Sequence, residues 1–202
     1  MKNPASWHIY RTRIRTVLSM RIEAPIAKIF HQLGFSPNAL TVLGLSISLF
    51  AAYLIYAGYF MLGGVVVLVG GFMDLIDGSL ARLQNNANET GALLDSIFDR
   101  ISELCILFGL LLFYVERGAV METVLIFLAL GGSFMVSYIR ARGEGLGVDC
   151  RVGFMTRPER VLLIAGGLLI DQMLVVLLAI VLLTCVTSIQ RFWYVYQTLK
   201  KW

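Results

Sequence analysis

Residues 74–99 read DLIDGSLARLQNNANETGALLDSIFD, and four aspartates there interrupt an otherwise apolar part of the chain. A carboxylate near the centre of a membrane helix costs about 2.5–3.5 kcal/mol even on lenient insertion scales, so four of them need a compensating role. Asp74 and Asp77 are three residues apart, which places both on one face of a helix. Asp95 and Asp99 are four residues apart and share a face in the same way.

The polar segment 84–90 between the two pairs has the length of a tight helix–helix connection. If the chain folds back at this segment, the two acidic faces oppose each other and form a cluster of hard oxygen ligands. Such a cluster suits Mg²⁺, Mn²⁺ or Ca²⁺ and does not suit a soft metal. The spacing therefore predicts a divalent-metal site.

Small residues surround the aspartates. Gly78, Ala81 and Gly91 remove side-chain bulk, so a ligand or a neighbouring helix can approach the backbone closely. Arg82 offers a planar fork that suits phosphate. Together with a metal, these features favour pyrophosphate chemistry. The alternative is a glycine-packed helix pair with ion-paired aspartates, but four acids beside one arginine would leave a large unpaired charge in the membrane.

Composition predicts an all-α integral membrane protein. The chain has 202 residues, of which 58% are hydrophobic, and its mean hydropathy is +0.78. Residues 1–34 combine cations with aromatic and aliphatic side chains, a pattern typical of an amphipathic juxtamembrane helix lying on membrane lipids, which Pro25 divides. Residues 35–202 are expected to form one domain with about six membrane spans, at roughly 37–58, 60–83, 91–115, 119–141, 158–171 and 173–197.

The distribution of cations predicts the topology. With the N-terminus inside, the outer segments are 57–60, 115–119 and about 171–173, and Arg117 is the only one of seventeen lysines and arginines that falls in them. We therefore expect the polar cluster and both termini on the cytoplasmic side. Nothing in this distribution predicts a nucleic-acid partner.

A second group of cations follows the fourth span. Arg140 lies in SYIRAR, and Arg157 and Arg160 flank Pro158 at a helix start, where backbone N–H groups already favour an anion. Arg191 lies near the inner end of the last span. Cations from three helices can hold a phosphate on an incoming substrate. The alternative is that these arginines only anchor the inner face by snorkelling.

The pattern Asp-Gly-x2-Ala-Arg-x8-Gly-x3-Asp-x3-Asp, with Asp74 ahead of it, resembles the signature of the CDP-alcohol phosphatidyltransferases, and every signature position matches. The resemblance implies that Asp74, Asp77 and Asp95 hold two Mg²⁺ or Mn²⁺ ions. It implies that Asp99 shares one ion and is the catalytic base for the attacking hydroxyl. It also implies a binding site for the cytidine diphosphate, formed by Gly78, Ala81 and Arg82 with Asp74 and Asp77. Asn38 and Thr41 join this site from the sequence SPNALT, which resembles the start of the family's first transmembrane helix.

Within this family, SYIRARGEGLG and TRPER resemble the subgroup that uses inositol phosphate, the phosphatidylinositol-phosphate and archaetidylinositol-phosphate synthases. The resemblance implies that Arg140, Arg160 and Arg191, with Arg157 nearby, bind the acceptor phosphate. The donor would be CDP-diacylglycerol or CDP-archaeol, the products a phosphatidylinositol-phosphate-type lipid and CMP, and the assembly a homodimer.

Other functions stay open at this point. The same family includes other acceptors, such as glycerol phosphate or serine, and a CDP-inositol donor, although serine carries no phosphate for the basic region to bind. A divalent-cation channel or transporter would also use intramembrane aspartates. That function leaves Gly78, Arg82 and the full signature unexplained, and it predicts ion flux without nucleotide binding.

Overall fold

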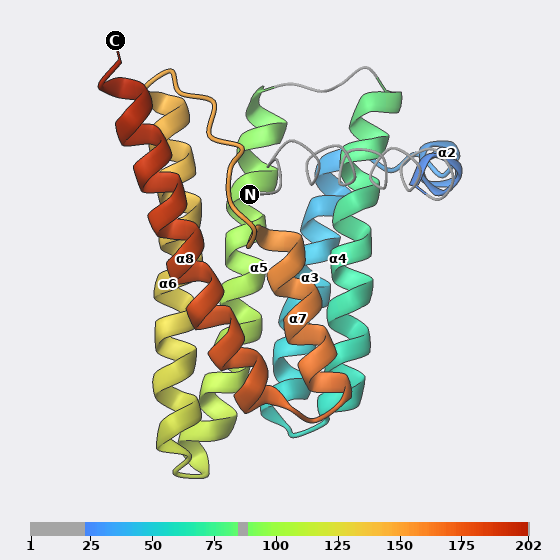
Figure 1. Ribbon diagram of the computed structural model, residues 1–202. Coiled ribbons are helices and arrows are strands. Elements are labelled where there is room, and N and C mark those ends of the chain that lie inside the picture. The colour runs from blue at the N-terminus through green and yellow to red at the C-terminus, as the bar shows by residue number, and fades with distance from the viewer. Residues whose placement is uncertain (1–22, 85–88, 202) are drawn as a thin grey trace. The chain divides into compact units, whose positions relative to one another are not determined.

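The computed structural model describes residues 23–84 and 89–201, and within these ranges every regular element is an α-helix. The helices, shown in Figure 1, are α2 (Ala24–Gln32), α3 (Pro37–Tyr56), α4 (Phe60–Leu83), α5 (Glu89–Glu116), α6 (Val120–Gly145), α7 (Arg157–Leu169) and α8 (Met173–Leu199). Most of the predicted amphipathic segment, residues 1–22, and residues 85–88 of the predicted connection lie outside the described residues.

The helices coincide with the predicted spans to within a few residues at each end, because local signals set their boundaries. Ser36 accepts a hydrogen bond from the Ala39 N–H at 3.2 Å and so caps the first turn of α3. The two predicted outer turns contain Gly58 and Gly118, whose φ angles of +85° and +65° favour glycine. Pro25 stands in the first turn of α2, where its missing N–H costs nothing.

Four of the described helices, α3, α4, α6 and α8, are long and apolar enough to cross a membrane. The fold class is therefore an all-α integral membrane protein. α5 carries several charged residues along its length, and α7 has only 13 residues, so neither meets the same measure of length and apolarity.

The described chain divides into two compact units, and the helices α3, α4 and α5 are each divided between them. The first unit combines the described residues up to Ser46 with Gly70–Asp99. Its core joins α2, α3 and α4 through four fully buried side chains: Ala27, Leu40, Ile76 and Leu80. This unit carries the whole signature.

The second unit combines Ile47–Val69 with the chain from Arg100 onward. α6 and α8 run side by side in it (Figure 1). Because lipid is as apolar as leucine, close packing must hold such helices together. Close packing is found at Gly167 of α7, where a Cβ would lie 2.8 Å from the Met173 sulfur and 2.9 Å from Val176 Cγ2.

Candidate active site

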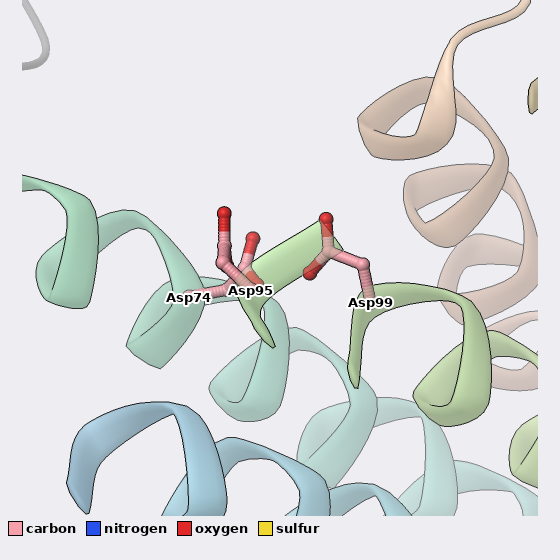
Figure 2. A group of neighbouring side chains, drawn as sticks. All are labelled: Asp74, Asp95 and Asp99. Carbon is pink, nitrogen blue, oxygen red and sulfur yellow. The ribbon is translucent and has the colours of Figure 1, made fainter. Parts of the chain in front are cut away.

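Three of the four predicted ligands lie together in the first unit. Asp74 comes from α4, and Asp95 and Asp99 come from successive turns of α5. One carboxylate oxygen from each lies within 4.8 Å of the others, and all three side chains are half-buried. Figure 2 shows the Asp74 and Asp95 carboxylates meeting between the two helices, with Asp99 beside them. Carboxylate oxygens in such a group fit a hard divalent cation.

Asp77 lies apart from this group of three. Its side chain is buried, and its Oδ2 accepts a hydrogen bond from the Thr41 hydroxyl at 2.9 Å. A carboxylate has about four lone-pair sites, so this bond leaves capacity for a metal. The role of Asp77 as a ligand stays a prediction, and the contact links it to the SPNALT segment at the start of α3.

Three residues that the family resemblance predicts to bind the nucleotide, Gly78, Ala81 and Arg82, lie on the last turns of α4. The Arg82 side chain is 59% exposed, and its Nη2 donates to Ser79 Oγ at 2.7 Å. Gly78 and Ala81 are half-buried. A Cβ at Gly78 would meet Arg82 Nη1 at 3.7 Å, so the missing side chain leaves room beside the guanidinium. Asn38 is exposed in the first turn of α3.

Two polar residues without a predicted role join this group. Glu23 and Ser79 are 4% and 7% exposed, respectively. Ser79 Oγ donates to Glu23 Oε2 at 2.7 Å, and Arg82 Nη2 lies 3.5 Å from the same carboxylate oxygen. A signal was present in the sequence, because Glu23 is the only acidic residue ahead of Asp74.

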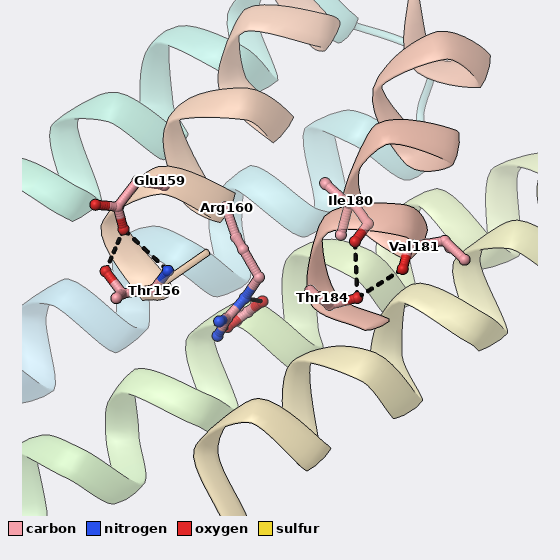
Figure 3. Close-up of polar contacts among 7 residues, drawn as sticks. Thr156, Glu159, Arg160, Ile180, Val181 and Thr184 are labelled. Atoms are coloured by element: carbon pink, nitrogen blue, oxygen red, sulfur yellow. Dashed lines mark hydrogen bonds and ion pairs between the residues drawn. The ribbon is translucent and has the colours of Figure 1, made fainter. Parts of the chain in front are cut away.

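The predicted acceptor arginines belong to the second unit, and two of them are buried. Arg160 donates from Nε and Nη2 to the two carboxylate oxygens of Glu103, at 2.6 Å each (Figure 3). Arg191 donates from Nε to the Val152 carbonyl at 2.9 Å and from Nη1 to the Val136 carbonyl at 2.7 Å. Each buried guanidinium thus has partners within the protein.

The other two arginines are more accessible. The Arg140 side chain is 51% exposed, and its Nε donates to Glu144 at 2.8 Å. Arg140 follows Val136 by one turn of α6, so the Arg191 contact with Val136 brings the two arginines close together. Arg157 is half-buried at the first position of α7. Its neighbour Glu159 accepts hydrogen bonds from the backbone N–H and the hydroxyl of Thr156, a capping box that fixes the start of the helix (Figure 3).

A small pocket opens beside the Arg160 ion pair. Ser133 in its wall is 4% exposed, and its hydroxyl has no hydrogen-bond partner among the described residues. The pocket is lined by Arg100, Glu103, Leu104, Leu130, Ser133, Phe134 and Ser137. Residues of α5 and α6 thus line the same space, and most of its surface is apolar.

Three carboxylates that could hold a divalent cation, in an integral membrane protein with long apolar helices, fit a metal-dependent phosphotransferase of the membrane. The family model for CDP-alcohol phosphatidyltransferases matches residues 35–196. The chain belongs to this family, and it is a transferase of phospholipid biosynthesis that releases CMP.

The relatives include inositol-lipid enzymes. The archaetidylinositol phosphate synthase of Pyrococcus horikoshii is 36% identical over 191 residues, which cover 94% of this chain and 97% of that protein. The crystal structure of Mycobacterium tuberculosis phosphatidylinositol phosphate synthase with CDP-DAG bound matches with a TM-score of 0.80 and 29% identity, covering 87% of this chain and 94% of that one. The same enzyme with manganese and citrate matches with a TM-score of 0.79 and 28% identity, covering 87% and 89%.

Proposed function

We propose that this enzyme transfers a phosphatidyl or archaetidyl group from a CDP-linked lipid to inositol 1-phosphate. The observation that carries the proposal is the complete signature, together with the proximity of Asp74, Asp95 and Asp99, whose carboxylate oxygens could hold a metal ion. The relatives named above carry inositol phosphate products in their names, and one of them has been solved with CDP-DAG. The donor is therefore CDP-diacylglycerol or its ether-lipid counterpart, CDP-archaeol.

The aspartates have distinct roles in this proposal. Asp74, Asp77 and Asp95 hold two ions, Mg²⁺ or Mn²⁺, and Asp99 shares one of them. When bound, the ions neutralise the pyrophosphate and stabilise the departing CMP. The Asp99 carboxylate takes the proton from the attacking hydroxyl of the acceptor as general base. A relative with manganese bound supports the choice of a divalent ion.

The cytidine diphosphate lies against the end of α4. Arg82 directs its guanidinium at the diphosphate, and Gly78 and Ala81 give the nucleotide access to the backbone. Asn38 and Thr41 contribute from the start of α3. Asp74 and Asp77 belong to the same site, where they would hold the ions.

The acceptor phosphate is bound by arginines. Arg140, Arg160 and Arg191 supply the contacts, and Arg157 adds charge at the start of α7. An arginine has five N–H donors, and Arg160 uses two of them on Glu103. The pairing with Glu103 orients the fork, and the other donors are the ones assigned to phosphate.

The membrane arrangement completes the proposal. Six helices, α3 to α8, span the bilayer within a domain at 35–202, and residues 1–34 lie on lipid headgroups at the interface. The active site and both termini face the cytoplasm, as the cation distribution predicts. The working unit is a homodimer embedded in membrane lipids.

The test is an assay of the full chain in lipid nanodiscs. CDP-diacylglycerol or CDP-archaeol is offered with inositol 1-phosphate, glycerol 3-phosphate, serine or free inositol, and CMP release and product mobility are measured with Mg²⁺, Mn²⁺ or excess chelator. Inositol 1-phosphate should give the highest kcat/KM, and chelation should abolish turnover. An Asp95→Asn variant measures the background. Equal use of free inositol would refute the phosphate clamp, and full activity after chelation would refute the metal site.

A further inference from the structure

A polar chain ties the segment before α2 to the signature helix α4. The Glu23 carboxylate accepts a hydrogen bond from Ser79 Oγ, which in turn accepts one from Arg82 Nη2, both at 2.7 Å. The carboxylate and the guanidinium are also 3.5 Å apart. Glu23 and Ser79 are buried, whereas the Arg82 side chain is exposed. The two buried residues therefore hold the guanidinium of a long side chain that would otherwise have many rotamers.

Contacts near both ends of α2 join it to α4 and to Gln84, the residue that follows α4. Glu23 precedes α2 and reaches Ser79, whereas His31 in its last turn lies 3.2 Å from Gln84 Nε2, which also donates to the Phe35 carbonyl at 3.0 Å. Between these contacts Ala27 is fully buried in the apolar core of the first unit. Packing of α2 therefore supports the position of Glu23 beside Ser79, in addition to the contacts of Glu23 itself.

The geometry points to Glu23 as a positioning residue that orients Arg82, through Ser79, for the diphosphate of the CDP-lipid donor. This inference rests on the proposed contact between Arg82 and the nucleotide. The contacts fix Nη2, whereas Nη1 faces the space that the missing side chain of Gly78 leaves open. Ordering a long arginine before the ligand arrives removes an entropic cost from binding.

A positioning role explains why an acidic residue stands in a basic segment, which binding to a lipid surface does not explain. Glu23 is the only acid among the first 73 residues, in a segment whose cations favour anionic headgroups. A negative charge there weakens attraction to such a surface, so its presence needs another function. Orienting the signature arginine is one.

The test compares donor and acceptor kinetics in Glu23→Gln, Ser79→Ala and Arg82→Ala, and in the double variant Glu23→Gln/Arg82→Ala. Glu23→Gln keeps the shape and an acceptor for Ser79 while removing the charge. Glu23→Gln and Ser79→Ala should each raise the KM for CDP-lipid by about 2- to 12-fold, the factor expected when the rotamer-rich side chain of Arg82 is no longer ordered before binding. The KM for inositol phosphate should stay near wild type in both variants. The thermal midpoint should stay near wild type in Glu23→Gln, whereas Ser79→Ala should lower it, because the buried Glu23 carboxylate loses a hydrogen-bond donor. Glu122→Gln on α6 is the matched control for the same chemical change.

The double variant separates positioning from a purely structural role. If Glu23 acts through Arg82, Glu23→Gln has no further effect on the donor KM once Arg82 is alanine. An equal fold-change in both backgrounds overturns the inference, as does an unchanged donor KM in both Glu23→Gln and Ser79→Ala. If Arg82→Ala itself leaves the donor KM unchanged, the proposed nucleotide contact of Arg82 is wrong, which is a different failure. Binding of CDP to the Mn²⁺-loaded protein, measured by calorimetry, should follow the same pattern without turnover.

Discussion

Replacing Arg160 with alanine would leave the Glu103 carboxylate buried without its counter-ion. The pair is almost inaccessible, with side-chain exposures of 2% and 5%, and is joined by two hydrogen bonds of 2.6 Å. Removing one partner of a buried ion pair costs about 3–5 kcal/mol, because the other charge stays in a medium that cannot solvate it. In a chain of this size each kcal/mol lowers Tm by about 2–4 °C. Arg160→Ala should therefore lower Tm by roughly 6–20 °C.

The same substitution also removes a proposed phosphate ligand, so stability and binding have to be measured separately. Arg160→Met combined with Glu103→Leu replaces the pair by apolar side chains, an exchange that is often neutral for stability. We expect the double variant to recover most of the lost Tm in detergent-solubilised protein. If Arg160 binds the acceptor, the double variant still has a KM for inositol phosphate that is about one to two decades above wild type, since a charge-assisted hydrogen bond contributes about 1.5–3 kcal/mol.

Two results would refute this reasoning. A Tm of Arg160→Ala within about 2 °C of wild type would mean that the ion pair is not desolvated as its burial indicates. A double variant with both normal Tm and normal acceptor KM would show that Arg160 has a structural role alone. Arg13→Ala, in the predicted interfacial segment, is the control for the general loss of a cation.

Two further predictions concern the signature and the packing. Asp99→Asn should reduce turnover more than tenfold, about 1.4 kcal/mol in barrier, while calorimetry still detects CDP-lipid binding, and a smaller loss would exclude Asp99 as the base. Gly109→Ala should lower the free energy of unfolding by about 1–3 kcal/mol, because its Cβ would lie 2.9 Å from Ala52 Cα on the backbone of α3. Gly131→Ala, with nothing within 4 Å of its Cβ, should be neutral or stabilising, and equal Tm values for the two would contradict the close approach.

The sequence predicted helix positions well because their signals are local. Apolar runs of membrane length, Ser36 ahead of Pro37, and the glycines at 58 and 118 each act within a few residues of a boundary. The acidic group was also predictable, since it needs only the spacing within α4 and α5 and a fold-back between them. A thirteen-residue helix such as α7, by contrast, is too short for hydropathy alone to establish a span.

The partners of the arginines could not be predicted in this way. Glu103 and Arg160 are 57 residues apart, and nothing local to either indicates the other. Arg191 bonds to backbone carbonyls, which every residue offers, so no residue type in the sequence marks its partners. A cation that binds phosphate and one that binds protein look the same in a sequence. The role of Glu23 was not predicted, because the cations around it indicate a lipid-surface segment and its partner Ser79 is 56 residues away.

Thr41 offers a test of how the start of α3 contributes to the site. The family resemblance places Thr41 at the nucleotide, whereas in the structure its hydroxyl lies 2.9 Å from Asp77 Oδ2 and 3.1 Å from the Pro37 carbonyl. A hydroxyl has one proton to donate, and an ionised carboxylate is the stronger acceptor. We therefore predict that Thr41 orients Asp77, in addition to its proposed place beside the nucleotide.

If Thr41 acts on Asp77, Thr41→Val should raise the Mn²⁺ concentration needed for half-maximal activity by about 10- to 100-fold, the usual effect of losing a hydrogen bond that orients a metal ligand. Thr41→Ser keeps the hydroxyl and should stay near wild type. Both are measured at saturating CDP-lipid, so that a weaker nucleotide contact does not imitate a weaker metal site. A Thr41→Val enzyme with unchanged Mn²⁺ dependence and a raised donor KM would show that the hydroxyl contacts the nucleotide. In that case the Thr41 hydroxyl either turns its single proton from Asp77 to the nucleotide or keeps that bond and accepts a hydrogen bond from the nucleotide through a lone pair.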